Sequence, residues 1–175
     1  MITCNPQEVS TVNITSLSPG DLFAYSGSDG KLMAMVVEND GEGWFLSWLR
    51  LTGPHAFAMD CMDGRGTMGR GFDVFRIPLK LRDLRLQIEP SRISPTAEHT
   101  VGSLLVDEHP RIVTAFRSHD GDGLDADLWM VSLHDLSRDR PSSGYACDEW
   151  RLVHVPDGLQ PEVIAESSGH RDQKC

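Results

Sequence analysis

The feature that most constrains the fold is a run of short apolar segments separated by tight turns. Residues 18–49 read "SPGDLFAYSGSDGKLMAMVVENDGEGWFLSWL". The sequences "GSDG" and "NDGEG" supply the Gly and Asp residues that tight hairpin turns favour. We therefore predict a three-stranded meander over 21–26, 31–38 and 44–51, followed by short strands at 72–81 and 84–89. Helical signals are limited to a possible single turn, so the expected fold class is all-β, with a minor helix possible.

A second stretch, residues 100–133, repeats the plan of the first. Gly102 to Val106 matches Gly20 to Ala24, and residues 110–121 match 30–41 at an offset of 80. Residues 128–133 match 44–49, and 148–156 match 70–78, with both segments ending on proline. This agreement is typical of a tandem duplication. The alternative is that any two β-meanders share alternating apolar residues and Gly/Asp turns.

We accordingly expect two small SH3-like barrels packed through a pseudo-twofold interface. The predicted division is an N-terminal arm (1–15), a first unit (16–90), a linker (91–100), a second unit (101–165) and a flexible tail (166–175). A unit of this size buries barely enough surface to be stable alone. Packing one copy against the other would increase the buried surface of both.

Composition limits the classes of partner. The 175 residues carry a net charge of −10. Eight basic and eleven acidic residues lie before Ser91, and eight basic and fifteen acidic residues lie from Ser91 onward. An acidic chain is repelled by phosphate backbones unless its basic residues gather on one face. The charge suits a partner protein with a basic surface.

Targeting and redox signals are absent from the sequence pattern. The four cysteines are scattered without a CxxC pair, and the first residues lack the features of a signal peptide. No apolar run approaches the roughly 18 residues needed to span a bilayer. We expect a cytoplasmic protein with free thiols, no membrane partner and no cofactor; a homodimer is compatible with the sequence.

The basic residues between 65 and 85 form one candidate site. The glycine-rich loop at 61–71 contains Arg65 and Arg70, and a backbone of this kind can form an anion-binding nest. The run "FRIPLKLRDLRL" adds Arg76, Lys80 and Arg82, together with Arg85. These residues indicate a candidate surface for binding RNA or phosphate. The simpler interpretation is a solvated strand face that protects a sheet edge.

The tryptophans form a second candidate site, for a partner. Trp44 and Trp48 share one face of a predicted strand with Leu46, while Phe45 and Leu49 lie on the other. Trp129 falls on the matching strand of the second stretch. Because both faces of the first strand are apolar, one should fill its own unit, and the other should meet the second unit or an outside partner.

The acidic turn "HDGDGLDADLW" is a weak metal candidate through Asp120, Asp122, Asp125 and Asp127. Clustered carboxylates bind calcium, although the order of an EF-hand loop is not followed. The alternative is a solvated hairpin turn. The histidines are dispersed and no G-x-S-x-G sequence occurs. We therefore assign no catalytic residue, and we favour a non-enzymatic function over an enzymatic one.

One resemblance is carried by "SPGDLFAY" followed by "KLMAMVVE". This opening looks like that of small SH3-like barrels, including bacterial toxin ribonucleases of the MazF type, in which a Gly-Asp pair precedes the first strand. The Arg-Pro pair before the second strand of such toxins is present here only in the reversed sequence "HPR" at 109–111. No catalytic residue is therefore transferred, and no family is recognised.

The sequence is compatible with three functions. The leading hypothesis is a non-enzymatic protein-binding or inhibitory protein that uses an acidic, aromatic-bearing face. The first alternative is an RNA-binding or ribonuclease-like barrel that uses the basic residues. The second is a small-molecule sensor with its pocket at the seam between the two units.

Overall fold

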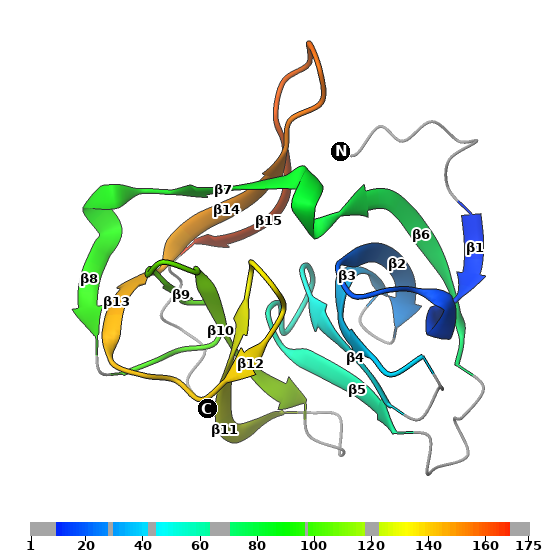
Figure 1. The fold of residues 1–175 in the computed structure, drawn as a ribbon, viewed down its shortest axis with the longest axis horizontal. Coiled ribbons are helices and arrows are strands. Elements are labelled where there is room, and N and C mark those ends of the chain that lie inside the picture. The colour runs from blue at the N-terminus through cyan, green and yellow to red at the C-terminus, as the bar shows by residue number, and fades with distance from the viewer. Residues whose placement is uncertain are drawn as a thin grey trace.

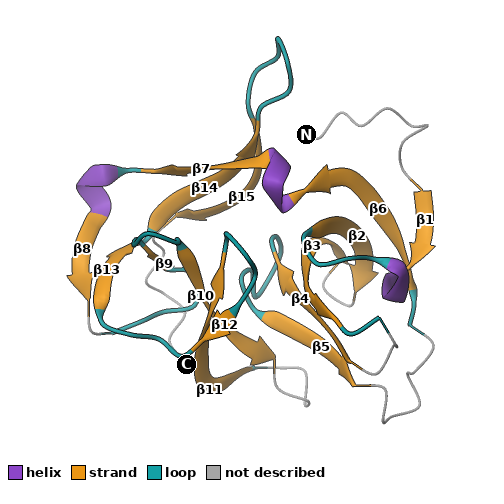
Figure 2. Ribbon diagram, in the orientation of Figure 1, coloured by secondary structure: helices purple, strands orange, loops and turns teal. Residues whose placement is uncertain are grey.

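The computed structural model describes residues 10–27, 30–41, 45–63, 71–96, 98–117 and 123–168. Strands contain 61% of these residues, and the only helices among them are three single-turn 3-10 helices (Figure 2). The all-β prediction is confirmed. None of the described helices has the length and apolar character needed to cross a bilayer.

The first half contains the predicted meander and its extensions. Its strands are β1 (Ser10–Asn13), β2 (Asp21–Gly27), β3 (Gly30–Asn39), β4 (Phe45–Arg50), β5 (Met59–Asp63), β6 (Asp73–Lys80) and β7 (Leu84–Ile88). The 3-10 turn η1 (Ile14–Ser16) follows β1, and η2 (Leu81–Asp83) separates β6 from β7.

The second half begins after η3 (Pro90–Arg92). Its strands are β8 (Ile93–Thr96), β9 (Leu104–Leu105), β10 (Arg111–Arg117), β11 (Leu124–Ser132), β12 (Arg138–Asp139), β13 (Gly144–Cys147), β14 (Glu149–His154) and β15 (Glu162–Ser168). β8 lies inside the segment expected as a linker, and β15 extends into the segment expected as a tail.

The pairings follow one order in both halves. In the first half β6 pairs with β1 and β2, and the meander continues from β2 through β3 and β4 to β5. In the second half β13 pairs with β8 and β9, and the meander continues from β9 through β10 and β11 to β12. β13 therefore takes the place of β6, whereas the sequence comparison had matched the residues of β14 to β6.

The expected closed barrels are not formed, because the strand order of each sheet is open. β5 pairs in parallel with β10 of the other half, where Met59 lies opposite Phe116, and this pairing joins both halves into one sheet of twelve strands. The physical reason is a shared core. Leu22, Met35 and Leu49 of the first half pack in one buried cluster with Leu104 and Ile112 of the second.

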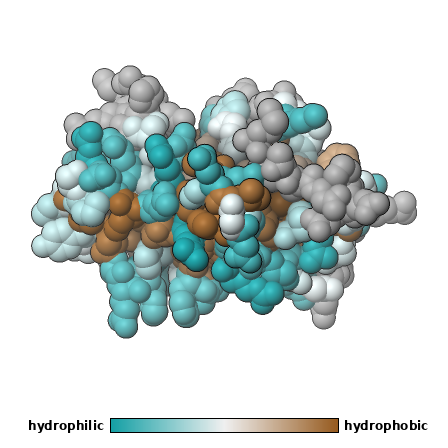
Figure 3. All heavy atoms as spheres, turned by 90° about the horizontal axis from the view of Figure 1, so that it is seen from above, coloured by the Kyte–Doolittle hydropathy of each residue, from teal (hydrophilic) through white to brown (hydrophobic). Residues whose placement is uncertain are grey.

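A second sheet of three strands, in the order β15-β14-β7, also joins the halves. Leu86 of β7 lies opposite Leu152 of β14. In Figure 1 β7 runs along the top of the second half, beside β14, and the hairpin between β14 and β15 projects beyond the rest of the fold. Seen from above, hydrophobic residues form a broken band across the middle of the face, with hydrophilic residues next to it (Figure 3).

The strand β4 is apolar on both faces, as predicted. Leu46 and Trp48 pack in a cluster confined to the first half, whereas Leu49 packs in the shared core. Leu49 is fully buried, and burial of a leucine side chain contributes about 1.5–3 kcal/mol. One face of β4 thus fills its own half and the other holds the two halves together. Trp44 lies outside the described residues.

Candidate binding groove between the two halves

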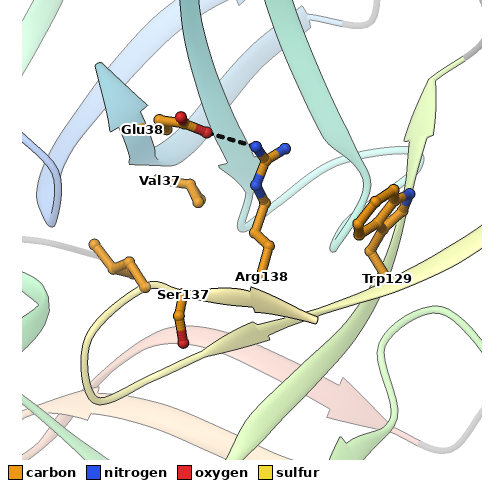
Figure 4. Close-up of a pocket in the computed structure, with 6 residues that line it drawn as sticks. Val37, Glu38, Trp129, Ser137 and Arg138 are labelled. Atoms are coloured by element: carbon orange, nitrogen blue, oxygen red, sulfur yellow. Dashed lines mark hydrogen bonds and ion pairs between the residues drawn. The ribbon is translucent and has the colours of Figure 1, made fainter. Parts of the chain in front are cut away.

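A groove of about 340 Å³ lies where β3 of the first half meets β11 and β12 of the second. We call it the seam groove. It is lined by Val37, Glu38, Trp129, Leu136, Ser137 and Arg138. Figure 4 shows Glu38 and Arg138 facing each other, with Trp129 beside them.

The alternation of β11 places Trp129 in this groove. Asp125, Asp127, Trp129 and Val131 share one face of the strand. Val131 is fully buried in the shared core, whereas Asp125 and Asp127 are exposed. Trp129 therefore lies half-buried where β11 leaves the core, and Phe116 of β10 contacts it edge-on with ring centroids 6.4 Å apart.

Arg138 connects the two halves. Its Nη2 donates to Oε2 of Glu38 at 2.6 Å. Its guanidinium carbon also lies 5.7 Å from the ring centroid of Phe45 and 5.8 Å from that of Phe116. A cation held near two ring faces and a carboxylate gains both cation–π and ionic attraction.

Arg140 makes similar contacts with Trp129, a residue of the groove, and with Asp127. Its guanidinium carbon lies 4.1 Å from the ring centroid of Trp129, and its Nη2 lies 3.2 Å from Oδ2 of Asp127. The Arg140 and Asp127 side chains are 56% and 72% exposed. An exposed ion pair of this kind contributes about 1 kcal/mol or less, so its partners exchange readily.

The charged residues at the groove form ion pairs. Glu38 pairs with Arg138, and beside Trp129 the side chain of Asp127 pairs with Arg140. Asp125 and Asp135 are exposed carboxylates close in sequence to these residues. Hydrogen bonds from the hydroxyl and amide of Ser137, and from the hydroxyl of Ser132, lower the pKa of Asp135 to about 2. Asp135 is therefore charged at neutral pH.

Leu136 lines the groove in a strained conformation. Its φ of 62° lies in the left-handed region, which costs a residue with a side chain about 1–2 kcal/mol. Its amide bonds back to the carbonyl oxygen of Ser132 at 3.1 Å, so a tight turn holds it there.

The other predicted partner and metal residues are distributed as follows. Trp48 is buried against Phe23 and Tyr25, so it does not reach a surface. Asp127 pairs with Arg140, while Asp120 and Asp122 lie outside the described residues. Within the described ranges, no group of three His, Cys, Asp or Glu residues is arranged to hold a metal ion.

The predicted basic residues gather elsewhere. Arg76, Lys80 and Arg82 line a second cavity, of about 370 Å³, together with Asp21. Arg65 and Arg70 lie outside the described residues. The sequence pattern grouped Arg76, Lys80 and Arg82 along the chain, but it did not identify Asp21. Asp21 is 55 residues from Arg76 and reaches it through the pairing of β2 with β6.

A second ionic cluster was missed altogether. Arg50, almost fully buried, donates from Nε to Oδ2 of Asp60 at 2.7 Å, and Arg117 of the second half lies 3.6 Å from Oδ1. The Tyr25 hydroxyl donates to the same carboxylate at 3.4 Å, and burial raises the pKa of Tyr25. The cluster ties β4 and β5 to β10, and no local sequence pattern marks such a long-range contact.

No protein-family model, curated protein or solved structure matches this chain.

Proposed function

We propose that the chain is a non-enzymatic protein-binding protein whose seam groove receives a basic segment of a partner protein. The observation that carries this proposal is the way in which the groove holds its own arginines. Arg138 lies near two aromatic rings and pairs with Glu38, while Arg140 lies over Trp129 and pairs with Asp127. A partner's arginine or lysine would meet the same rings and carboxylates.

Charge supports a basic partner. The whole chain carries a net charge of −10, and Asp125, Asp127 and Asp135, close in sequence to residues of the groove, are exposed carboxylates. An acidic surface of this kind attracts a basic protein over several ångströms and accelerates the encounter. The inhibitory role would follow if the partner's own function uses the segment that the groove covers.

Exchange of the groove's own arginines costs little. Glu38 and Asp127 are about half exposed or more, and Arg140 is mostly exposed, so each pair contributes about 1 kcal/mol or less. A partner cation can therefore replace Arg140 on Trp129 without a large loss of stability. Release of Arg140 also lets Asp127 pair with the incoming group.

The test compares two variants that remove the same charge. Glu38→Gln with Asp127→Asn removes the two carboxylates that pair with Arg138 and Arg140, whereas Asp157→Asn with Glu166→Gln removes two exposed carboxylates of the β14–β15 hairpin. We expect the wild type and the hairpin variant to retain a basic protein from native lysate, with retention falling as salt rises. The groove variant should lose it.

Two results would contradict this proposal. Equal retention by all three proteins would show that the groove is not the binding site. Equal loss in both variants would show attraction by net charge alone.

A small-molecule site in the same groove is a second candidate. Its volume of about 340 Å³ falls in the range of about 300–1,000 Å³ that is typical of ligand pockets. Trp129 and Arg138 would suit a planar anion. A ligand screen by thermal shift should find a compound that raises the melting temperature of the wild type but not of Trp129→Ala.

We also propose that the two halves arose by duplication of one SH3-like unit. The support is the common order of five antiparallel pairings in each half and the matching glycine turns at Gly20 and Gly102. An experimental structure in which strands β2, β3, β4 and β6 do not superpose on β9, β10, β11 and β13 would contradict the shared origin.

A further inference from the structure

The turns at residues 18–21 and 100–103 have the same backbone geometry. Gly20 and Gly102 adopt φ values of 85° and 92°. The amide of Asp21 donates to the carbonyl oxygen of Ser18 at 3.0 Å, and the amide of Ser103 donates to that of Thr100 at 3.0 Å. The two turns therefore differ in their side chains and in what surrounds them, not in their backbones.

The second-half turn is uncharged at its last position and is closed by aromatic rings. The Ser103 hydroxyl donates to Oδ1 of Asp148 at 2.8 Å. Trp150 donates from Nε1 to the carbonyl oxygen of Gly102 at 2.7 Å, and Phe57 packs against its ring. This half shows that the turn forms with a serine at the last position and needs no buried carboxylate there.

The first-half turn carries a buried carboxylate and opens onto a cavity. The Asp21 side chain is 3% exposed, and it accepts the amide of Ser18 at 3.0 Å. Lys80 Nζ lies 2.9 Å from Oδ1, and Arg76 Nη2 lies 3.3 Å from Oδ2. Desolvation alone would raise the pKa of Asp21, but the Lys80 and Ser18 hydrogen bonds and the Arg76 charge hold it below its usual value of 3.8.

A bulge at Pro78 creates this arrangement. Leu22 pairs with Ile77, but Asp21 pairs with Lys80, so Pro78 and Leu79 are the extra residues of β6. Proline lacks the amide that a regular ladder needs, which is why it is tolerated at a bulge. The bulge brings Lys80 opposite the turn and places the Arg76 and Lys80 side chains on either side of one carboxylate.

We propose that this cavity, lined by Arg76, Lys80 and Arg82, binds a phosphate group of a ligand. Asp21 engages one nitrogen of Arg76 and the Lys80 ammonium, and it thereby fixes both side chains. The remaining N–H groups of these two residues are available for an anion, because the side chains are 45% and 37% exposed. A guanidinium beside an ammonium is a common phosphate-binding pair.

Arg82 adds the third donor. Its side chain is 80% exposed and lies 3.9 Å from Oδ1 of Asp83, whose other oxygen accepts the amide of Lys80 at 2.8 Å. Three cations and two carboxylates give the cavity a net charge of +1 in a chain of net charge −10. This local excess suits one phosphate group rather than a long stretch of nucleic-acid backbone.

The neighbouring aromatic residue favours recognition of the phosphate alone. Phe75 is half exposed, but it neighbours Arg76 in β6, and adjacent side chains of a strand lie on opposite faces. A base stacked on Phe75 would thus lie away from the cavity. The phosphate can come from a phosphomonoester or from the backbone of a short RNA.

Calorimetric titration separates these sources. Inorganic phosphate, adenosine monophosphate and an RNA hexamer without a terminal phosphate are each titrated into the wild type at low salt. Binding of the first two indicates a phosphomonoester site, and binding of the hexamer alone indicates a backbone phosphate; either result supports the proposal. No binding of any of the three overturns it.

The variant Arg82→Gln tests the location, with Arg85→Gln as the matched control. Arg82 is so exposed that its loss leaves the fold intact, whereas Arg85 is an exposed cation outside the cavity. We expect Arg82→Gln to weaken binding about tenfold, the loss of one charged hydrogen bond, and Arg85→Gln to leave it unchanged. Equal weakening by both variants would show diffuse attraction and would overturn the site. Lys80→Ala is a less direct test, because it removes a partner of buried Asp21.

Discussion

The turn at residues 18–21 and the turn at residues 100–103 place the same backbone in opposite environments. Around the second turn, Trp150 and Phe57 fill the space with aromatic rings. Around the first, Asp21 holds two cations beside an open cavity. The difference shows which parts of the turn are constrained. Glycine is needed at its third position by the left-handed backbone, whereas the fourth position accepts either a serine or a carboxylate.

The largest expected effect is at the closed turn. Trp150→Ala removes a fully buried ring together with the hydrogen bond to Gly102, and we expect it to lower the free energy of unfolding by about 3–5 kcal/mol. Leu81, which bonds through its backbone to Gly20 at the open turn, is only half-buried, so Leu81→Ala should cost clearly less. Urea unfolding of both variants measures the difference. Equal losses would show that the two turns contribute alike.

The two glycines give the next effect. A Cβ at Gly102 would lie 2.9 Å from Cδ2 of Phe57, whereas a Cβ at Gly20 would meet nothing closer than 3.8 Å. Gly20→Ala should therefore cost only the backbone strain, about 1–2 kcal/mol. Gly102→Ala adds overpacking and should cost about 2–4 kcal/mol. Thermal unfolding followed by circular dichroism checks the order; the reverse order would mean that the closed turn relaxes around Phe57.

The pH dependence of stability distinguishes the charged turn further. The pKa of Asp21 is lower in the folded state than its ordinary value of 3.8. Its contribution to stability is therefore fully present above the unfolded pKa and is lost as pH falls through the folded value. Urea unfolding between about pH 5 and about pH 2 should show a steeper loss for the wild type than for Asp21→Ser. Parallel curves would contradict the ionic role of Asp21.

The smallest expected effect on stability is at the mouth of the open cavity. Arg82→Gln should change the free energy of unfolding by no more than about 0.5 kcal/mol, because an exposed side chain contributes little. The same variant is expected to weaken phosphate binding. A stability loss as large as that of Gly20→Ala would indicate that the cations of the open turn serve the fold rather than a ligand.

Local patterns predicted much of the secondary structure. Gly and Asp at the turns located β2, β3 and β4, and the alternation in β4 predicted that Leu46 and Leu49 pack on opposite sides. Pro78 occupies a bulge, which agrees with its inability to donate a backbone hydrogen bond to a regular ladder. These features depend on interactions between near neighbours, so a single sequence contains the information needed to predict them.

The candidate sites were predictable only in part. Trp129 and the basic residues of β6 were identified from composition and spacing. Their partners were not: Glu38 is 100 residues from Arg138, and Asp21 is 55 residues from Arg76. Nothing in the local sequence of an acidic residue indicates which distant cation it will meet.

The sequence by itself determined that the chain is built of short strands, that its turns require glycine and that β4 is apolar on both faces, because alternation and backbone sterics act locally. Only the tertiary structure decided that β5 pairs with β10, that β7 crosses to β14, and that the seam groove and the cavity beside Asp21 form. Pairing between distant strands depends on how the whole core packs, and residues from both halves contribute to the packing energy of that core.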